Sequence, residues 1–97
     1  MDVSDWRARI DEIDWRLLEL LNERVRCVLK LSPLKLRAAI PVYSPERERE
    51  VIGKLQERNQ GPLDDEAVRR IFALIMEEMR AVQERERAKD AVPSHPD

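Results

Sequence analysis

The stretch that decides the fold is WRARIDEIDWRLLELLNERVRCVLKL, residues 6–31 of a 97-residue chain. Its apolar side chains recur mostly at steps of three and four residues, the spacing that places them on one face of an α-helix. These positions are Trp6, Ile10, Ile13, Leu17, Leu20, Leu21, Val28 and Leu31. The pattern predicts a helix that begins after Ser4, its expected N-cap, and continues to about Ala39.

Pro33 falls inside this predicted helix. A proline in a helix interior removes a backbone hydrogen bond and crowds the preceding turn, at a cost of about 3 kcal/mol. We expect a kink at this position. The alternative is a full break near Ser32, which would give a shorter helix pair compatible with a monomer.

Two further helices are predicted, and no strand. Ser44 is the expected N-cap of the second helix, with Pro45 in its first position, and the helix should end near Asn59, before Gly61 and Pro62. The third helix should open at Asp64 and run to about Arg87. Its apolar stripe comprises Val68, Ile71, Phe72, Ile75, Met79 and Val82. We therefore expect an all-α helical domain over residues 1–88 and a disordered C-terminal tail over residues 89–97.

The length of the first helix predicts an oligomer. About 35 residues at a rise of 1.5 Å span roughly 52 Å, whereas a compact domain of this size has a radius of gyration of only about 12 to 13 Å. Two shorter helices cannot cover such a long apolar stripe. A second copy of the chain is the expected cover, so the sequence predicts a homodimer.

Composition narrows the classes of partner and site. Eighteen basic and twenty acidic residues give a net charge of −2, which argues against nucleic acid or an anionic membrane as the partner. The charged N-terminal stretch and the lack of a long apolar run favour a cytoplasmic protein. Cys27 is the only cysteine and His95 the only histidine, so we expect no internal disulfide, no metal site and no cofactor.

One face of the first helix carries a candidate anion site. Arg24, Val28, Leu31 and Lys35 follow one another at steps of four, three and four residues, so they form one stripe with a cation at each end, about 16 Å apart. The two long side chains could hold a small acid over an aliphatic floor. The alternative is a solvated helix face with extended Lys and Arg side chains, which the spacing alone favours.

Arg47 and Glu48 lie in the first turn of the second helix, where backbone N–H groups favour an anion. They could equally be an ordinary charged first turn. Gln83 follows Met79 by four residues and places an amide beside an apolar stripe, although a single such glutamine is more often a surface residue. These groups provide no nucleophile–base pair and no phosphate-binding glycine loop. An enzyme built on them would hold and polarise its substrate without a covalent intermediate.

Four segments together resemble a known family. WRARIDEIDWRLLELLNER, the lysine eleven residues after it, PVYSPERERE and FALIMEEMRAVQ occur in the order and spacing of the AroQ class of all-helical chorismate mutases, over residues 5–84. The resemblance implies an intertwined homodimer of one long and two shorter helices. It also implies rearrangement of chorismate to prephenate in phenylalanine and tyrosine biosynthesis, with no cofactor.

The resemblance also implies a role for individual residues. Arg7 resembles the arginine that reaches into the partner's site, and Arg24 the local arginine that binds a substrate carboxylate. Lys35 would bind a carboxylate and the ether oxygen of chorismate. Gln83 would donate a hydrogen bond to the same oxygen.

Two residues of the second helix complete the implied site, and three positions depart from the family pattern. Arg47 would form part of the pocket wall, and Glu48 would accept a hydrogen bond from the ring hydroxyl. Ser44 replaces a common aspartate, and Met79 replaces a serine that often contacts a carboxylate. Pro33 lies two residues before the expected catalytic lysine.

Two other functions fit the same residues. An isochorismate-pyruvate lyase is a related helical enzyme with a similar anionic substrate, but related lyases carry an apolar residue where this chain has Glu48. A non-catalytic helical module could instead sense chorismate or dock on another shikimate-pathway enzyme. Such a module would bind chorismate without consuming it.

Overall fold

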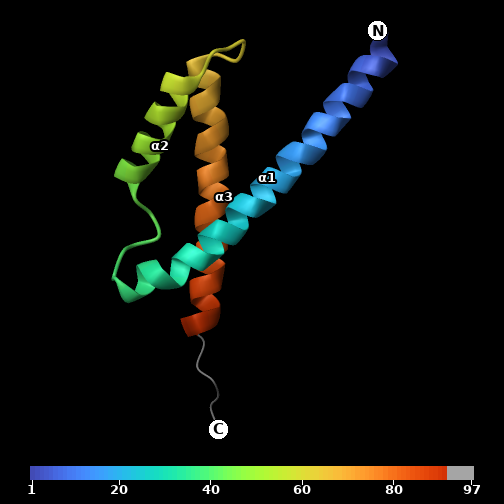
Figure 1. Cartoon of the computed structure of the whole chain (residues 1–97). Coiled ribbons are helices and arrows are strands. Elements are labelled where there is room, and N and C mark those ends of the chain that lie inside the picture. The colour runs from blue at the N-terminus through green and yellow to red at the C-terminus, as the bar shows by residue number, and fades with distance from the viewer. Residues whose placement is uncertain (92–97) are drawn as a thin grey trace.

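The computed structural model describes residues 1–91, which form three α-helices and no strand. These are α1 (Val3–Arg37), α2 (Pro45–Arg58) and α3 (Asp65–Ala91). Helix α3 packs against both α1 and α2, and the N-terminal part of α1 extends away from the other two helices (Figure 1). The all-α class predicted from the sequence is confirmed. None of the three helices is both long and apolar enough to cross a membrane.

Helix α1 begins earlier than predicted. Its N-cap is Asp2 rather than Ser4: the Asp2 carboxylate accepts a hydrogen bond from the backbone N–H of Asp5 at 3.0 Å, and the Asp5 carboxylate accepts one from the backbone N–H of Asp2 at 3.0 Å. This reciprocal pair satisfies two N–H groups that the helix cannot bond internally. Serine and aspartate are about equally good N-caps, so the sequence alone could not choose between them.

Pro33 lies within α1, which continues without a break to Arg37. The alternative of two separate helices is therefore wrong. Figure 1 shows the last turns of α1 bending away from the straight course of its N-terminal part, as expected where a proline removes a backbone hydrogen bond. Helix α1 crosses α3 next to this bend (Figure 1), and Ser32 is only 2% exposed there.

The two connections between helices are fixed by hydrogen bonds. In the first, the Arg87 guanidinium donates from Nη2 to the backbone oxygen of Ile40 at 3.0 Å, which ties the connection to α3. In the second, the Asn59 side chain donates to the backbone oxygen of Leu63 at 2.7 Å. The Asp64 carboxylate caps α3 by accepting from the backbone N–H of Ala67 at 2.7 Å.

Helix α3 extends to Ala91, four residues past its predicted end near Arg87. The first three residues of the predicted tail, 89–91, are therefore helical. Residues 92–97, including His95, lie outside the part of the chain that the structure describes.

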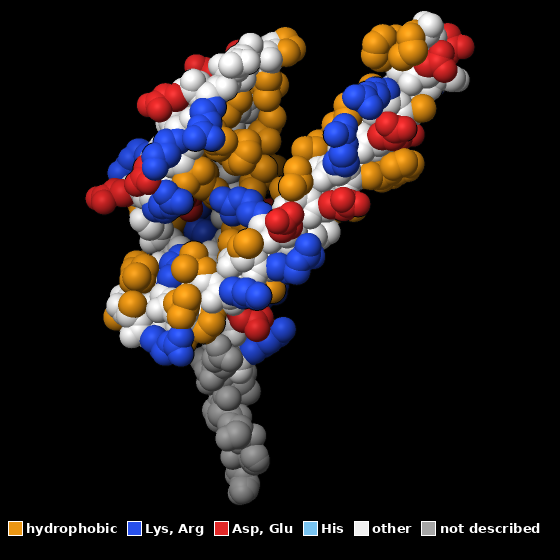
Figure 2. All heavy atoms as spheres, in the orientation of Figure 1, with side chains coloured by type: hydrophobic (Ala, Val, Ile, Leu, Met, Phe, Trp, Pro, Cys, Tyr) orange, Lys and Arg blue, Asp and Glu red, His pale blue; other side chains and the backbone are white. Residues whose placement is uncertain are grey.

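The buried core of the single chain is small, and much of the apolar surface is exposed. The buried apolar side chains among the described residues are Val28, Val68, Met76 and Met79. The exposed apolar positions of α1 include Trp6, Ile10, Ile13, Leu17, Leu20 and Leu21. Figure 2 shows apolar side chains along the α1 arm and on the side of α2 and α3 that faces it. The Cα radius of gyration, 17.7 Å, exceeds the value of about 13 Å for a compact domain of 100 residues.

Helix α2 begins as the sequence predicts. Ser44 is its N-cap, with the side-chain oxygen accepting from the backbone N–H of Arg47 at 3.2 Å, and Pro45 is its first residue. The proline has no N–H to leave unsatisfied and its φ suits the first turn. This cap fixes where α2 starts and hence where the side chains of its first turn lie.

Replacing the cap should destabilise the fold measurably. We expect Ser44→Ala to lower the free energy of unfolding by about 1 kcal/mol, because one backbone N–H loses its partner. Ser44→Asp keeps a side-chain acceptor and should stay within a few tenths of a kcal/mol of the parent or exceed it. Chemical denaturation at one fixed protein concentration measures both. An alanine variant as stable as the parent would contradict the capping role.

Candidate active site

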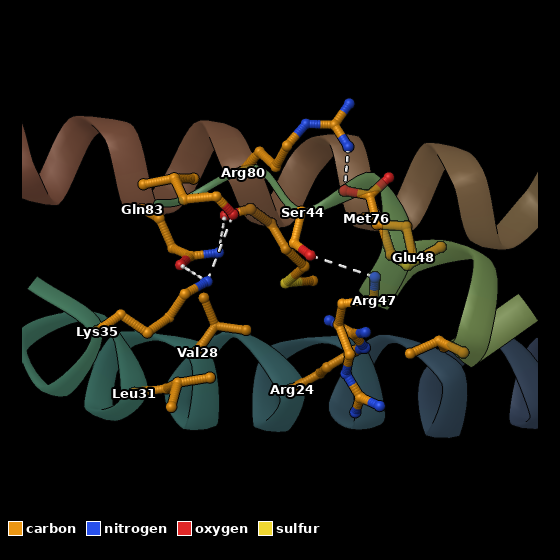
Figure 3. A pocket seen from close by; sticks show the side chains of 13 residues that line it. Arg24, Val28, Leu31, Lys35, Ser44, Arg47, Glu48, Met76, Arg80 and Gln83 are labelled. Atoms are coloured by element: carbon orange, nitrogen blue, oxygen red, sulfur yellow. Dashed lines mark hydrogen bonds and ion pairs between the residues drawn. The ribbon is translucent and has the colours of Figure 1, made fainter. Parts of the chain in front are cut away.

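The three helices enclose a pocket of about 170 Å³ beside the bend in α1 (Figure 3). It brings together seven of the eight residues that the sequence analysis selected for the site: Arg24, Lys35, Ser44, Arg47, Glu48, Met79 and Gln83. The predicted aliphatic floor, Val28 and Leu31, also lines the pocket. Residues from α1, α2, α3 and the first connection therefore meet in one cavity.

Lys35 and Gln83 form one end of this pocket. The Lys35 ammonium donates to the Gln83 side-chain oxygen at 3.1 Å and to the backbone oxygen of Val42 at 3.4 Å. Gln83 is only 6% exposed, and its Nε2 donates to the backbone oxygen of Met79 at 3.4 Å. Each nitrogen carries further hydrogens, since an ammonium has three and a primary amide two. Both can therefore donate to a ligand atom without giving up these contacts.

Burial and charge both act on Lys35. Partial desolvation, followed by the positive charge of Arg87, lowers the pKa of Lys35 below its usual 10.5. Both effects disfavour the protonated amine. An anion bound beside Lys35 would oppose them, because it would compensate the positive charge.

The first turn of α2 brings two charged residues to the pocket. Glu48 is partly buried, whereas the Arg47 side chain is 64% exposed and its Nη1 lies 2.7 Å from the Glu50 carboxylate. An exposed ion pair of this kind contributes little stability and is readily exchanged. Arg47 therefore lies at the rim of the pocket and Glu48 deeper in its wall.

Arg80 is a pocket residue that the sequence analysis missed. Its Nη1 donates to the Glu48 carboxylate, and its guanidinium carbon lies 4.6 Å from the centre of the Tyr43 ring. Pairing with Glu48 raises the pKa of Arg80. Arg80 follows Met76 by four residues and precedes Gln83 by three, so it lies on the same helix face as two other pocket residues. That shared face was the signal that could have found it.

Arg7 is the one selected residue that the structure leaves outside the pocket of its own chain. It precedes Arg24 by seventeen positions in the same helix, which corresponds to about 26 Å along the helix axis. No side chain bridges that distance. Within one chain, Arg7 and Arg24 cannot contact the same small ligand.

The pocket favours an anion although the chain as a whole is acidic. Four cationic side chains line it, those of Arg24, Lys35, Arg47 and Arg80, and Glu48 is the one carboxylate among the lining residues. The net charge of the full chain is −2. Cations gathered in a partly enclosed site attract an anionic ligand more strongly than the same charges spread in water. Among the side chains that the structure describes, no group of His, Cys, Asp or Glu could hold a metal ion.

Comparison with known proteins agrees with this architecture. The family model described as chorismate mutase type II matches residues 6–84. A bifunctional chorismate mutase/prephenate dehydratase of Neisseria gonorrhoeae is 46% identical over 77 residues, which cover 79% of this chain and 21% of that protein. A chorismate mutase of Methanocaldococcus jannaschii is 28% identical over 82 residues, covering 84% and 83% of the two chains. This chain spans about a fifth of the length of the bifunctional relatives it matches.

Two solved structures share the fold. Form II of the chorismate mutase from Thermus thermophilus has a TM-score of 0.83 at 32% identity, covering 86% of this chain and 94% of that one. The chorismate mutase from Helicobacter pylori in complex with prephenate has a TM-score of 0.81 at 28% identity, covering 94% and 97%. Since the family model spans most of the chain and the fold agrees, this chain belongs to the chorismate mutase type II family.

Proposed function

We propose that this protein is a chorismate mutase, which rearranges chorismate to prephenate in the synthesis of phenylalanine and tyrosine. The observation that carries the proposal is the pocket. Lys35 and Gln83 lie in contact at one end of it, and Arg24, Arg47 and Arg80 also line it, so its cationic side chains outnumber its one carboxylate. Family membership and the prephenate complex of the Helicobacter pylori relative support it. The catalytic unit is the helical domain, predicted over residues 1–88, whose last helix continues to Ala91. The expected location is the cytoplasm.

The reaction explains why such a pocket suffices. One C–O bond breaks and one C–C bond forms within a single molecule, so neither a nucleophile nor a proton carrier is required. The protein must hold the compact chair-like conformer and stabilise the negative charge that grows on the ether oxygen. Orientation and preorganised electrostatics supply these two effects.

Lys35 and Gln83 are the proposed donors to the ether oxygen. The Lys35 ammonium donates to the Gln83 oxygen at 3.1 Å, and the Gln83 amide nitrogen donates to the backbone oxygen of Met79. Each nitrogen has a further hydrogen for a ligand atom. A hydrogen bond to the ether oxygen strengthens as the C–O bond breaks, which stabilises the transition state more than the bound substrate. The amide of Gln83 is neutral at every relevant pH and needs no protonation for this role.

The remaining residues bind and orient the substrate. Arg24 binds one carboxylate, and Arg7 of a second copy binds the other, because a planar guanidinium matches a carboxylate well. Glu48 accepts a hydrogen bond from the ring hydroxyl. Arg47 closes the rim of the pocket.

Ser44 and Met79 contact the substrate in ways that differ from the family pattern. The Ser44 oxygen already caps α2, but its hydroxyl hydrogen remains available to a ligand. The Met79 thioether offers van der Waals contact and only a weak acceptor where a serine would donate. We expect these two positions to affect catalytic efficiency more than the nature of the reaction.

A homodimer completes the proposed site. The apolar positions of α1 are exposed in the single chain, and burial of such a face is the main favourable term in association. The same helix carries Arg7 away from its own pocket. Packing two α1 helices together would cover the apolar face and bring Arg7 toward the other copy's pocket, in an interface of the kind expected for a two-fold dimer.

The direct test is incubation of the purified protein with chorismate and identification of the product. We expect prephenate. We expect Lys35→Ala to lower turnover by about 100- to 1000-fold, by analogy with loss of one oxyanion donor. Lys35→Arg should not restore the parental rate, because a guanidinium cannot replace a compact ammonium at one oxygen.

Controls separate this outcome from loss of structure. Helical content and dimer mass of both lysine variants should equal those of the parent, since the Lys35 ammonium lies at the pocket and contributes little packing. Rates within threefold of the parent would remove Lys35 from the catalytic site. Release of pyruvate from isochorismate without formation of prephenate from chorismate would identify a lyase instead, and binding without turnover would identify a sensing module.

The dependence of kcat/KM on pH is a further prediction. We expect a flat profile from about pH 6 to 9, because no side chain transfers a proton. Above this range kcat/KM should fall as Lys35 loses its proton, at a pH below the ordinary 10.5 of lysine. Arg87→Met removes a positive charge that lowers the pKa of Lys35, so the fall should move to higher pH.

Arg85→Met is the matched control for Arg87→Met, because Arg85 is exposed on the same helix and is not among the groups that lower the pKa of Lys35. Its profile should follow that of the parent. A bell-shaped profile centred near neutral pH would show that an acid or base had been missed.

Mixing inactive variants tests the shared site. Arg7→Ala and Arg24→Ala chains, combined in equal amounts, should form mixed dimers in which one of the two sites keeps both arginines. Random pairing would restore about a quarter of the parental activity. Scattering or sedimentation should report twice the chain mass.

The matched control combines Arg24→Ala with Lys35→Ala. Both residues belong to the same chain's part of the site, so no mixed dimer of these two variants contains an intact site. This pair should show no rescue. Mixed dimers of the first pair that remain inactive, or a fully active monomer, would refute the role of Arg7.

A further inference from the structure

The contact between Arg80 and Glu48 differs from the other ion pairs among the described residues. Their side chains are 25% and 22% exposed, whereas both partners of every other ion pair formed by the described residues are at least 41% exposed. It is also the pair that joins two helices, since the others connect residues three or four positions apart. Reduced contact with water strengthens such a pair. Its geometry is therefore more firmly set than that of the surface pairs.

Three segments meet at Arg80. Tyr43 comes from the connection between α1 and α2, Glu48 from the first turn of α2, and Arg80 from the middle of α3. The Tyr43 ring lies against the guanidinium, with 4.6 Å from its centre to the guanidinium carbon, and an aromatic face attracts and orients a cation. The ring and the carboxylate together limit the conformations open to the Arg80 side chain.

Without Arg80, the Glu48 carboxylate could form an ion pair with another cation of the pocket. Arg24 and Arg47 line the same pocket, and under the proposed function they face the anionic ligand. A carboxylate that turned to either guanidinium would compete with the ligand for it. Because Arg80 engages Glu48 from the side of α3, the Glu48 carboxylate stays at the pocket wall with an oxygen left to accept a further hydrogen bond.

We infer that Arg80 is a positioning residue, which acts through Glu48 to fix the acceptor for the ligand's hydroxyl group and to keep that carboxylate away from Arg24 and Arg47. This inference rests on the proposed function, in which Glu48 receives the hydroxyl of chorismate. Arg80 itself does not touch the reacting atoms. By holding this acceptor in place, Arg80 makes the pocket prefer a dianion with a hydroxyl group on the side that faces α2 over a dianion without one.

The test measures kcat and KM for chorismate in a cycle of Arg80→Met, Glu48→Gln and the double variant. We expect each single change to lower kcat/KM by about 10- to 100-fold, the range for loss of a hydrogen bond to a charged group. The double variant should be no worse than about threefold below the poorer single variant, because both changes remove one shared interaction.

The separation of kcat from KM distinguishes positioning from structural damage. The hydroxyl takes no part in the bonds made or broken, so its hydrogen bond acts similarly in substrate and transition state. Most of the loss in Arg80→Met should therefore appear as a higher KM. A merely structural role would reduce the fraction of folded enzyme, which lowers apparent kcat and leaves KM unchanged.

Two further variants complete the design. Arg80→Lys keeps the charge but loses the planar group that lies on Tyr43, so it should recover part of the loss and leave kcat/KM about 2- to 10-fold below the parent. If Arg80→Met folds poorly, Arg80→Lys replaces it in the cycle with Glu48→Gln. Arg85→Met, on an exposed position of the same helix, should keep the parental kcat/KM.

Each result has a definite meaning. A parental kcat/KM for Arg80→Met overturns the inference, and so does a double variant in which the two losses multiply in full, because Arg80 would then act on the ligand directly. Failure of the parent to convert chorismate is a separate result, which refutes the proposed function before any variant is compared.

Discussion

The length of α1 is the constraint on which the rest of the structure depends. A helix of 35 residues cannot be wrapped by two shorter helices, so the single chain buries few apolar side chains and leaves most of the apolar face of α1 in water. Only the C-terminal part of α1 crosses α3, and the pocket forms there. The same length carries Arg7 far from that pocket. Under the proposed function, burial of the apolar face and completion of the site would both be met by a second copy of the chain.

The pocket is costly to build without a ligand. Four cations converge on one small cavity, and both desolvation and the charge of Arg87 disfavour protonated Lys35. An anion with two carboxylates would offset these costs on binding, and donors already in place need no reorganisation during the reaction. The inferred role of the Arg80–Glu48 pair fits this scheme, since the pair supplies an acceptor inside a cationic site without occupying Arg24 or Arg47.

Much of the fold and most of the site could be predicted from the sequence, because both depend on local patterns. The three- and four-residue periodicity predicted the helices, Ser44 and Pro45 predicted the start of α2, and the resemblance selected seven residues that do line one pocket. The errors have physical reasons. Asp2 competes with Ser4 as an N-cap of similar strength, and no glycine or proline stops α3 before Ala91. Arg80 was missed because its partner Glu48 lies 32 residues away, and that contact exists only after α2 and α3 pack together.

Two local irregularities of this fold lie close to Lys35. Pro33 removes a helical hydrogen bond two residues before it, and Ala39, four residues after it, has a φ of 58°, a left-handed conformation that costs a non-glycine residue about 1 to 2 kcal/mol. The bond from Arg87 to the backbone oxygen of Ile40 helps to hold this distorted segment against α3. Within this segment the Lys35 ammonium donates to the side-chain oxygen of Gln83, 48 residues away in the sequence. Departures from local preference that tertiary contacts stabilise are typical of functional sites. Here both departures lie within four residues of Lys35, the residue that we propose as catalytic.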